Sequence, residues 1–297
     1  MNKFMKIVFF GTPDYVLPIL TTLHKKFVTG PGKSPISAVV TQPPKPTGRK
    51  QILTYSPVDK WAYDHKIPVY YSANELITNP IEADLGVLAA HGEIIKKEVI
   101  DIFPHGILVI HPSLLPKYRG ASPIPATIAA GKKVTGVTIF KMDEKVDHGP
   151  IISQFNEEVL PTDTTDSLRT RLFERSSKVL AELLTPYLQG KITPRIQNDS
   201  EATYTKIMKK EDGLIDLNKK SAEEAEMFIR AMLPWPGAWT LLHLSATDKK
   251  DRRLKLLKAH VENGKLVLDE VQLEGKEPVT WKQFKEGYRD ATFVTGD

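Results

Sequence analysis

Short apolar runs alternate with helical patterns through the first half of the chain. The runs that predict buried strands cover residues 7–11, 36–40, 67–71, 85–90 and 107–110. Helical patterns begin near Val16 and at Asp59, between these runs. Continuous apolar strands that alternate with helices are typical of a parallel sheet covered on both faces. We therefore expect a Rossmann-like α/β domain with a parallel sheet in the N-terminal part.

A long amphipathic helix is predicted next. Capping residues are concentrated at 162–166, and Gly190 is placed to end the helix. Between them, apolar residues recur at near-helical spacing, at Leu168, Leu172, Val179, Leu183 and Tyr187. The polar stretch 191–207 then predicts a linker. Residues 1–190 are accordingly expected to form one domain.

The pattern becomes β-rich after the predicted linker. One helix is expected at 221–232, and short strands are expected at 239–244, 254–259, 265–268 and 271–273. Small β-rich domains of this size are often barrels. Residues 208–297 are therefore expected to form a small OB-like β-barrel.

Composition and motif searches exclude several classes of protein. The chain has 297 residues and no cysteine, which excludes disulfides and thiolate chemistry. No apolar run is long enough for a signal peptide or a membrane span, so we expect a cytoplasmic protein, and without an obvious assembly segment a monomer. The loop 11–14 lacks the G-x-G-x-x-G pattern, and no Walker A, G-x-S-x-G or metal-binding histidine spacing occurs. We therefore expect neither bound NAD nor a metal.

Basic residues dominate one part of the N-terminal domain. No Asp or Glu occurs between Tyr15 and Val58. The same stretch contains Lys25, Lys26, Lys33, Lys45, Arg49 and Lys50. One-sided charge of this kind attracts polyanions such as RNA. Lys45, Arg49 and Lys50 in the proline-rich loop 42–50 are therefore candidate RNA contacts, with solvated loop charges as the alternative.

Residues 106–152 contain the candidate chemistry. A predicted strand ends at His111 and brings its imidazole to the carboxyl edge of the sheet, where open α/β folds bind ligands. Residues 113–116 are apolar and end in proline, so we expect their backbone groups to face a planar heterocycle. Asp147 lies in a predicted turn before Gly149, a suitable place for a carboxylate that reaches a histidine. The alternatives are a structural histidine, a turn-forming aspartate and core leucines.

These residues resemble the signature of the folate-dependent formyltransferases. The family pattern is Asn-x-His, then Ser-Leu-Leu-Pro, then Asp-x-Gly, and His111 and Asp147 occupy the catalytic His and Asp places. The places that contact the reduced folate are occupied by Ser113, Leu114, Leu115 and Pro116, with His91 and Gly92 added from the Ala-His-Gly segment. The resemblance implies 10-formyltetrahydrofolate as co-substrate.

Further segments resemble the members of this family that act on methionyl-tRNA. They are the opening Phe-Phe-Gly-Thr-Pro, the Gln42-Pro43 loop, the Ser-Pro-Val at 56–58, the Pro-Trp-Pro at 234–236 and the Trp281-Lys282 ending. The likeness implies transfer of a formyl group to the α-amino group of methionyl initiator tRNA, for translation initiation. In such a reaction His111 would stabilise the oxyanion or transfer a proton, and Asp147 would orient it; which of the two is the base stays open.

Three positions depart from the family pattern. Val109 stands where the family has asparagine, His91 stands where tyrosine is usual, and Pro44 stands where aspartate is common. Residues two apart in a strand point to the same face, so position 109 points the same way as His111. Valine offers no hydrogen-bond donor, and loss of one oxyanion donor costs about 10²–10³ in rate. His91 or a water is a candidate replacement.

Other functions are compatible with part of this pattern. Val109 motivates a catalytically impaired or silent homologue that still binds folate or RNA. The His111 and Asp147 motif also fits an enzyme that formylates an amino sugar on a nucleotide carrier. Formylation of glycinamide ribonucleotide leaves residues 208–297 without an evident role. Formylation assays with tRNA and with sugar nucleotides separate these cases.

Overall fold

A computed structural model describes residues 5–27, 34–48, 50–245, 247–248 and 250–294. The chain divides into two compact units. The first contains Met1–Arg119, Gly136–Glu157 and Arg169–Tyr204, and the second contains Gly120–Thr135, Glu158–Leu168 and Thr205–Asp297. This division differs from the expected boundaries at 190 and 207, since two internal segments belong to the second unit. Such long-range contacts leave no mark in a local hydrophobic pattern.

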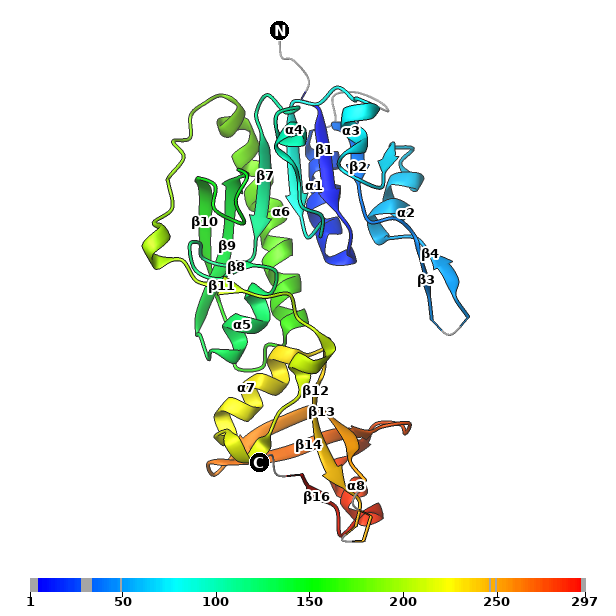
Figure 1. Cartoon of the computed structure of the whole chain (residues 1–297). Helices are drawn as coiled ribbons and strands as arrows, with labels where there is room; N and C mark the ends of the chain where they lie inside the picture. The colour runs from blue at the N-terminus through cyan, green and yellow to red at the C-terminus, as the bar shows by residue number, and fades with distance from the viewer. Residues whose placement is uncertain (1–4, 28–33, 49, 246, 249, 295–297) are drawn as a thin grey trace. The chain divides into compact units, whose positions relative to one another are not determined.

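The first unit is built on a seven-stranded sheet in the order β10-β9-β7-β6-β1-β2-β5 (Figure 1). Its parallel strands are β1 (Ile7–Gly11), β2 (Ile36–Val40), β5 (Val69–Tyr70), β6 (Leu85–Ala89) and β7 (Ile107–His111). These strands are almost entirely buried, which agrees with their continuous apolar runs. The expected Rossmann-like α/β architecture is therefore confirmed. Two later strands extend the sheet, β9 (Val134–Lys141), which runs antiparallel to β7, and β10 (Ile151–Glu158).

Helices follow most of the parallel strands. They are α1 (Leu17–Lys26), α2 (Pro57–Asp64), α3 (Glu75–Thr78) and α4 (Lys97–Ile100), with a 3-10 turn, η1 (Asp14–Val16), before α1. Helix α2 begins at Pro57, before the expected Asp59, because the Ser56 hydroxyl caps it by accepting a hydrogen bond from the Asp59 N–H and Pro57 suits the first turn. The expected loop 42–50 instead contains strand β3 (Lys45–Thr47). This strand forms a hairpin with β4 (Ile52–Thr54), which projects from the sheet in Figure 1.

The long helix is α6 (Thr165–Leu188), and Gly190 after it has the left-handed backbone typical of a helix end. Its buried stripe differs from the expected one. Val179 and Leu183 are only partly buried, whereas Leu172, Leu180 and Leu184 are fully buried. The stripe passes through Ser176, whose hydroxyl donates to the Leu172 carbonyl at 2.7 Å. Because Ser176 is polar, the sequence pattern did not count it as a buried position. The buried stripe of the helix was therefore assigned to the wrong residues.

The second unit contains a five-stranded sheet in the order β15-β14-β13-β12-β16. Its strands are β12 (Ala238–His243), β13 (Arg252–Glu262), β14 (Lys265–Leu273), β15 (Val279–Thr280) and β16 (Thr292–Phe293), all paired antiparallel. The expected strands at 265–268 and 271–273 are one strand. Asn263 and Gly264, both with positive φ, form the tight turn between β13 and β14. The expectation of β-rich structure is therefore confirmed, as an antiparallel sheet, and the OB-like barrel stays a prediction.

Helices and short elements complete the chain. The second unit contains α5 (Pro123–Ala129), α7 (Ala222–Met232), α8 (Trp281–Gly287) and the 3-10 turns η3 (Lys210–Gly213) and η4 (Leu217–Lys219). Strand β8 (Arg119–Gly120) pairs with β11 (Tyr204–Thr205), which follows η2 (Asp199–Glu201). Within the described residues, no helix has the length and apolar character that a membrane crossing requires.

Candidate active site

The parallel strands bring polar residues together at their carboxyl ends. The Thr12 hydroxyl, just beyond β1, lies 3.4 Å from the His91 carbonyl, just beyond β6. Gln42, just beyond β2, donates its backbone N–H to the Thr12 hydroxyl at 3.3 Å and its side-chain amide to the His91 carbonyl at 3.4 Å. Ligands bind at this edge in open α/β sheets, and β7 ends at the same edge with His111.

The side chains of His111 and Asp147 lie next to each other at this edge. The Nδ1 atom of His111 lies 3.5 Å from a carboxylate oxygen of Asp147. The side chain of His111 is 6% exposed and that of Asp147 is 18% exposed, so the pair is largely withdrawn from water. Asp147 has a φ of 47°, a left-handed backbone that a non-glycine residue adopts at a cost. The expected turn therefore carries the carboxylate to the histidine.

The second nitrogen of His111 also has a partner. Its Nε2 lies 2.9 Å from the carbonyl oxygen of Tyr118. A carbonyl only accepts, so Nε2–H is the donor, and a hydrogen bond from Nδ1 to Asp147 requires a proton on that nitrogen as well. The surroundings of His111 thus provide an acceptor for each N–H of an imidazolium ring. This arrangement fits a histidine that gains and loses a proton during a reaction.

Val109 faces an apolar cluster. It is 5% exposed and packs with Leu115, Phe140 and Ile151, in contact with the partly buried Leu88 and Met142. In the sheet it lies opposite Phe140 of β9, as His111 lies opposite Thr138. Position 109 is therefore on the His111 side of the strand, as expected, and its side chain is surrounded by hydrocarbon.

The segment 113–116 is held by internal hydrogen bonds. The Thr138 hydroxyl donates to the Ser113 carbonyl at 2.7 Å and accepts from the Leu115 N–H at 3.0 Å. Gln154 donates to the Leu115 carbonyl at 3.0 Å, and the Ser113 hydroxyl donates to the Lys117 carbonyl at 2.7 Å. The expectation that these backbone groups face a heterocycle is therefore wrong for Leu115. Thr138 and Gln154 shape the segment as a rigid support, with Leu114 and Pro116 partly exposed.

His91 is fixed by Glu93. Its Nε2 lies 3.1 Å from the Glu93 carboxylate, which also accepts from the Ser72 hydroxyl and the Ala73 N–H. Burial lowers the pKa of His91, and the Glu93 hydrogen bond offsets this only in part. Burial raises the pKa of Glu93, but its three hydrogen bonds outweigh burial and lower it.

This geometry determines what His91 can offer. The ionised Glu93 only accepts, so Nε2 carries the proton and Nδ1 of the neutral ring is an acceptor. Nδ1 is buried, without a hydrogen-bond partner in the described part of the chain. His91 therefore does not supply the donor that Val109 lacks, contrary to one expectation from the sequence. The neighbouring Gly92 has a φ of 85° and is exposed.

The buried state of His91 predicts a pH dependence of stability. Its pKa in the folded protein is lowered below 6.5, so below pH 6.5 the unfolded chain takes up a proton that the folded protein does not. The free energy of unfolding should fall as pH decreases from about 7.5 to about 5.5, and His91→Phe should make that decline shallower. Urea unfolding across this range measures both. Equal slopes for the two proteins would contradict the prediction. Glu93 does not interfere, because its own contribution is lost only below 4.5.

The predicted RNA contacts lie on the projecting hairpin. Lys45 and Lys50 are exposed there, and Arg49 lies outside the described residues. The hairpin also exposes apolar side chains: Ile52 is 62% exposed and Leu53 is 52% exposed. The hairpin therefore exposes lysine side chains and large apolar side chains on the same element.

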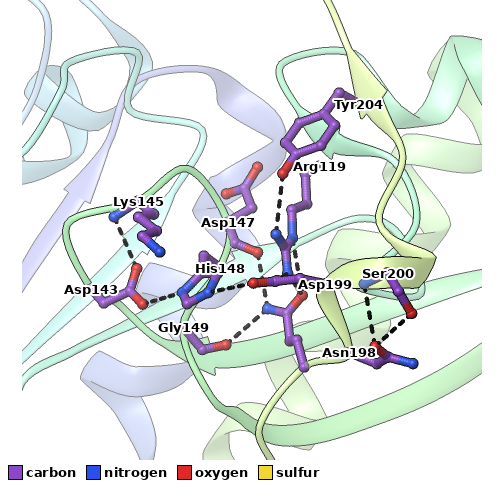
Figure 2. A network of polar contacts seen from close by, with 11 residues as sticks. Arg119, Asp143, Lys145, Asp147, His148, Gly149, Asn198, Asp199, Ser200 and Tyr204 are labelled. Atoms are coloured by element: carbon purple, nitrogen blue, oxygen red, sulfur yellow. Dashed lines mark hydrogen bonds and ion pairs between the residues drawn. The ribbon is translucent and has the colours of Figure 1, made fainter.

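A polar network beside Asp147 was missed from the sequence (Figure 2). It joins Arg119, His148, Gln197 and Asp199 to the turn that carries Asp147. Gln197 and Asp199 fall in the polar stretch 191–207 that was expected to be a linker. The paired positions are 50 to 80 residues apart in sequence, so only the fold reveals them. Among the described residues, no group of three or more His, Asp or Glu side chains could hold a metal ion.

Comparisons with known proteins identify the family. The Formyl transferase family model matches residues 5–184, and the Formyl transferase C-terminal domain model matches residues 207–266. The methionyl-tRNA formyltransferase of Chloroflexus aggregans is 41% identical over 244 residues, covering 80% of this chain and 76% of that protein. The enzyme of the same name from Citrifermentans bemidjiense is 34% identical over 313 residues, covering 96% and 94%.

A solved structure shares the fold at low identity. The N-formyltransferase of Helicobacter canadensis, determined with folinic acid and dTDP-3-aminofucose, aligns with a TM-score of 0.67 at 16% identity and covers 93% of this chain and 98% of its own. This likeness shows the fold alone. The sequence relatives are more specific, and both family domains occur in order along the chain. The protein therefore belongs to the methionyl-tRNA formyltransferase family.

Proposed function

We propose that this protein transfers the formyl group of 10-formyltetrahydrofolate to the α-amino group of methionyl initiator tRNA, for translation initiation. The single observation that carries the proposal is the His111–Asp147 pair at the carboxyl edge of the sheet, in a chain that belongs to this family. No metal is needed for the chemistry that follows.

The reaction requires two proton movements. The amine nitrogen attacks the formyl carbon, the carbonyl oxygen becomes an oxyanion, and the bond from that carbon to the folate nitrogen then breaks. The attacking nitrogen loses a proton, and the leaving folate nitrogen gains one. His111 is the group that carries a proton between them, with Asp147 stabilising the imidazolium form.

Stabilisation of the oxyanion rests on fewer donors than the family pattern supplies. Val109 cannot donate, and His91 presents an acceptor. In our proposal Nε2 of His111 leaves the Tyr118 carbonyl and takes the proton of the attacking amine, and the imidazolium N–H so formed is the remaining donor to the oxyanion until the proton passes to the leaving folate nitrogen. The protein is therefore an active but slowed enzyme.

The reduced folate is proposed to lie against the 113–116 segment and the 91–92 turn. Leu114 and Pro116 are partly exposed and offer apolar contact, and the exposed Gly92 offers its backbone. Lys45 and Lys50 on the hairpin are proposed to contact the phosphates of the tRNA, because such contacts are charge-driven, and Arg49, outside the described residues, is proposed to do the same.

The experiment that tests this proposal identifies the molecule that accepts the formyl group. Purified protein with 10-formyltetrahydrofolate is given methionyl initiator tRNA, a dTDP-linked amino sugar, or glycinamide ribonucleotide, and the formylated products are identified by mass spectrometry. We expect N-formyl-methionine from the tRNA reaction and no product from the other two. Product only from the amino sugar would replace this proposal with sugar formylation. No product from any acceptor would leave a silent homologue.

A further inference from the structure

The turn that carries Asp147 is fastened to the chain segment 197–204. Gln197 donates from its side-chain nitrogen to two carbonyl oxygens of the turn, that of Asp147 at 2.9 Å and that of Gly149 at 2.8 Å. Gln197 is 7% exposed. The buried amide of Gln197 therefore uses both of its N–H donors to hold the backbone of this one turn in place.

Arg119 fixes the orientation of Gln197. The guanidinium donates from Nε and one terminal nitrogen to the Gln197 side-chain oxygen, at 3.2 Å and 2.9 Å. The carbonyl oxygen of Gln197 thus faces the arginine, and its NH₂ group faces the turn. Arg119 is 2% exposed and also donates to Asp199 at 2.7 Å and to the Tyr204 hydroxyl at 3.3 Å. Lysine, with a point charge, cannot reproduce this fork.

A second connection closes the network, as Figure 2 shows. Asp199 lies 3.2 Å from Nε2 of His148, the residue after Asp147. Nδ1 of His148 lies 2.6 Å from Asp143, so both ring nitrogens face carboxylates. The turn is therefore held at two places. Gln197, oriented by Arg119, binds its backbone carbonyls, and Asp199 contacts the side chain of His148.

The same segment also reaches the other partner of His111. The Thr203 hydroxyl accepts the Tyr118 N–H at 2.8 Å, and the Thr203 carbonyl accepts the Arg119 N–H at 2.8 Å. The carbonyl of Tyr118 is the group that accepts from Nε2 of His111. Both partners of the imidazole are therefore attached to residues 197–204.

We propose that Gln197, oriented by Arg119, is a positioning residue for formyl transfer: it holds the Asp147 carboxylate at Nδ1 of His111 without touching either substrate. The inference rests on the proposed function. Asp147 occupies a left-handed backbone conformation, which persists only where neighbouring groups enforce it. Gln197 supplies that constraint through the two carbonyls. A misplacement of about 1 Å at a catalytic group costs about 10²-fold in rate.

Two substitutions at position 197 test the proposal. Gln197→Met removes the hydrogen bonds and keeps the length, and Gln197→Glu keeps an acceptor for Arg119 but sets a carboxylate oxygen against the two carbonyls. In single-turnover assays both should be slower by about 10- to 100-fold, with the KM for 10-formyltetrahydrofolate unchanged. Asn198→Ala is the matched control, since the hydrogen bonds of its side chain within the described residues go to Ser200 and Glu201 and not to the turn or to Arg119. It should keep the unaltered rate.

A second readout does not depend on the acceptor. The imidazole ¹⁵N chemical shifts of His111, assigned through His111→Gln, should move in both Gln197 variants and stay in place in Asn198→Ala. Moved shifts in a protein that formylates nothing would support the positioning role and reject the proposed function. Unmoved shifts and an unaltered rate in the two Gln197 variants, with circular dichroism confirming their fold, would overturn the positioning role.

Discussion

Val109→Asn should increase the single-turnover rate of formyl transfer by about 10²–10³. Position 109 lies on the His111 side of β7, and the asparagine side chain offers an N–H donor where valine offers none. That donor would meet the oxyanion as it forms, which is the moment at which a donor accelerates a reaction. The gain should therefore appear in the rate of the chemical step and leave the affinity for folate almost unchanged.

The same substitution should weaken the fold. Val109 packs against Leu115, Phe140 and Ile151, and an amide in that cluster has no evident partner until substrate arrives. An unsatisfied buried amide costs about 1–3 kcal/mol. Val109→Ala is the control, because it shortens the side chain without adding a donor. A rate for Val109→Asn that equals the Val109→Ala rate, after correction for the folded fraction, would show that the family asparagine place has no catalytic role here.

His111→Ala should lower the single-turnover rate by about 10²–10⁴, the usual contribution of proton transfer by a positioned side chain. His111 is proposed both to carry the proton and to supply the remaining oxyanion donor, so its loss removes two contributions at once. Asp147→Asn keeps the shape and removes the charge that stabilises the imidazolium form. It should be slower by a smaller factor than His111→Ala.

Non-additivity checks this assignment. Residues that act as one unit lose little more together than the more damaging one loses alone. The double variant His111→Ala with Asp147→Asn should therefore be about as slow as His111→Ala. If the rate loss of the double variant equals the product of the two single losses, Asp147 acts independently, as a base of its own. Single-turnover formylation measures all three variants on one scale.

The proposed catalytic pair, His111 and Asp147, was predictable because its signals are local. His111 ends an apolar run, and Asp147 precedes a glycine in a turn, so each residue carries its own evidence in the neighbouring sequence. The family pattern then paired them. The 3.5 Å separation agrees with that prediction. The direction of the Val109 side chain was predictable for the same reason, because residues two apart in a strand point to the same face.

Residues that act over long sequence distances were not predictable. Gln197 and Asp199 lie in a polar stretch, and nothing nearby distinguishes a buried glutamine from a solvated one. Their partners Asp147 and Arg119 are 50 and 80 residues away. The protonation of His91 depends in the same way on Glu93, Ser72 and Ala73, which meet only in the folded chain. The hairpin of β3 and β4 was hidden by prolines that usually mark loops.

The central claim is that this chain catalyses formyl transfer through His111 and Asp147 although it lacks the family asparagine. The most direct measurement is single-turnover formation of N-formyl-methionyl-tRNA by the unaltered protein, beside His111→Ala, with 10-formyltetrahydrofolate as donor. We expect product well above the uncatalysed level for the unaltered protein, and a loss of about 10²–10⁴ in rate for His111→Ala. Product formation at the same rate by both proteins would contradict the claim.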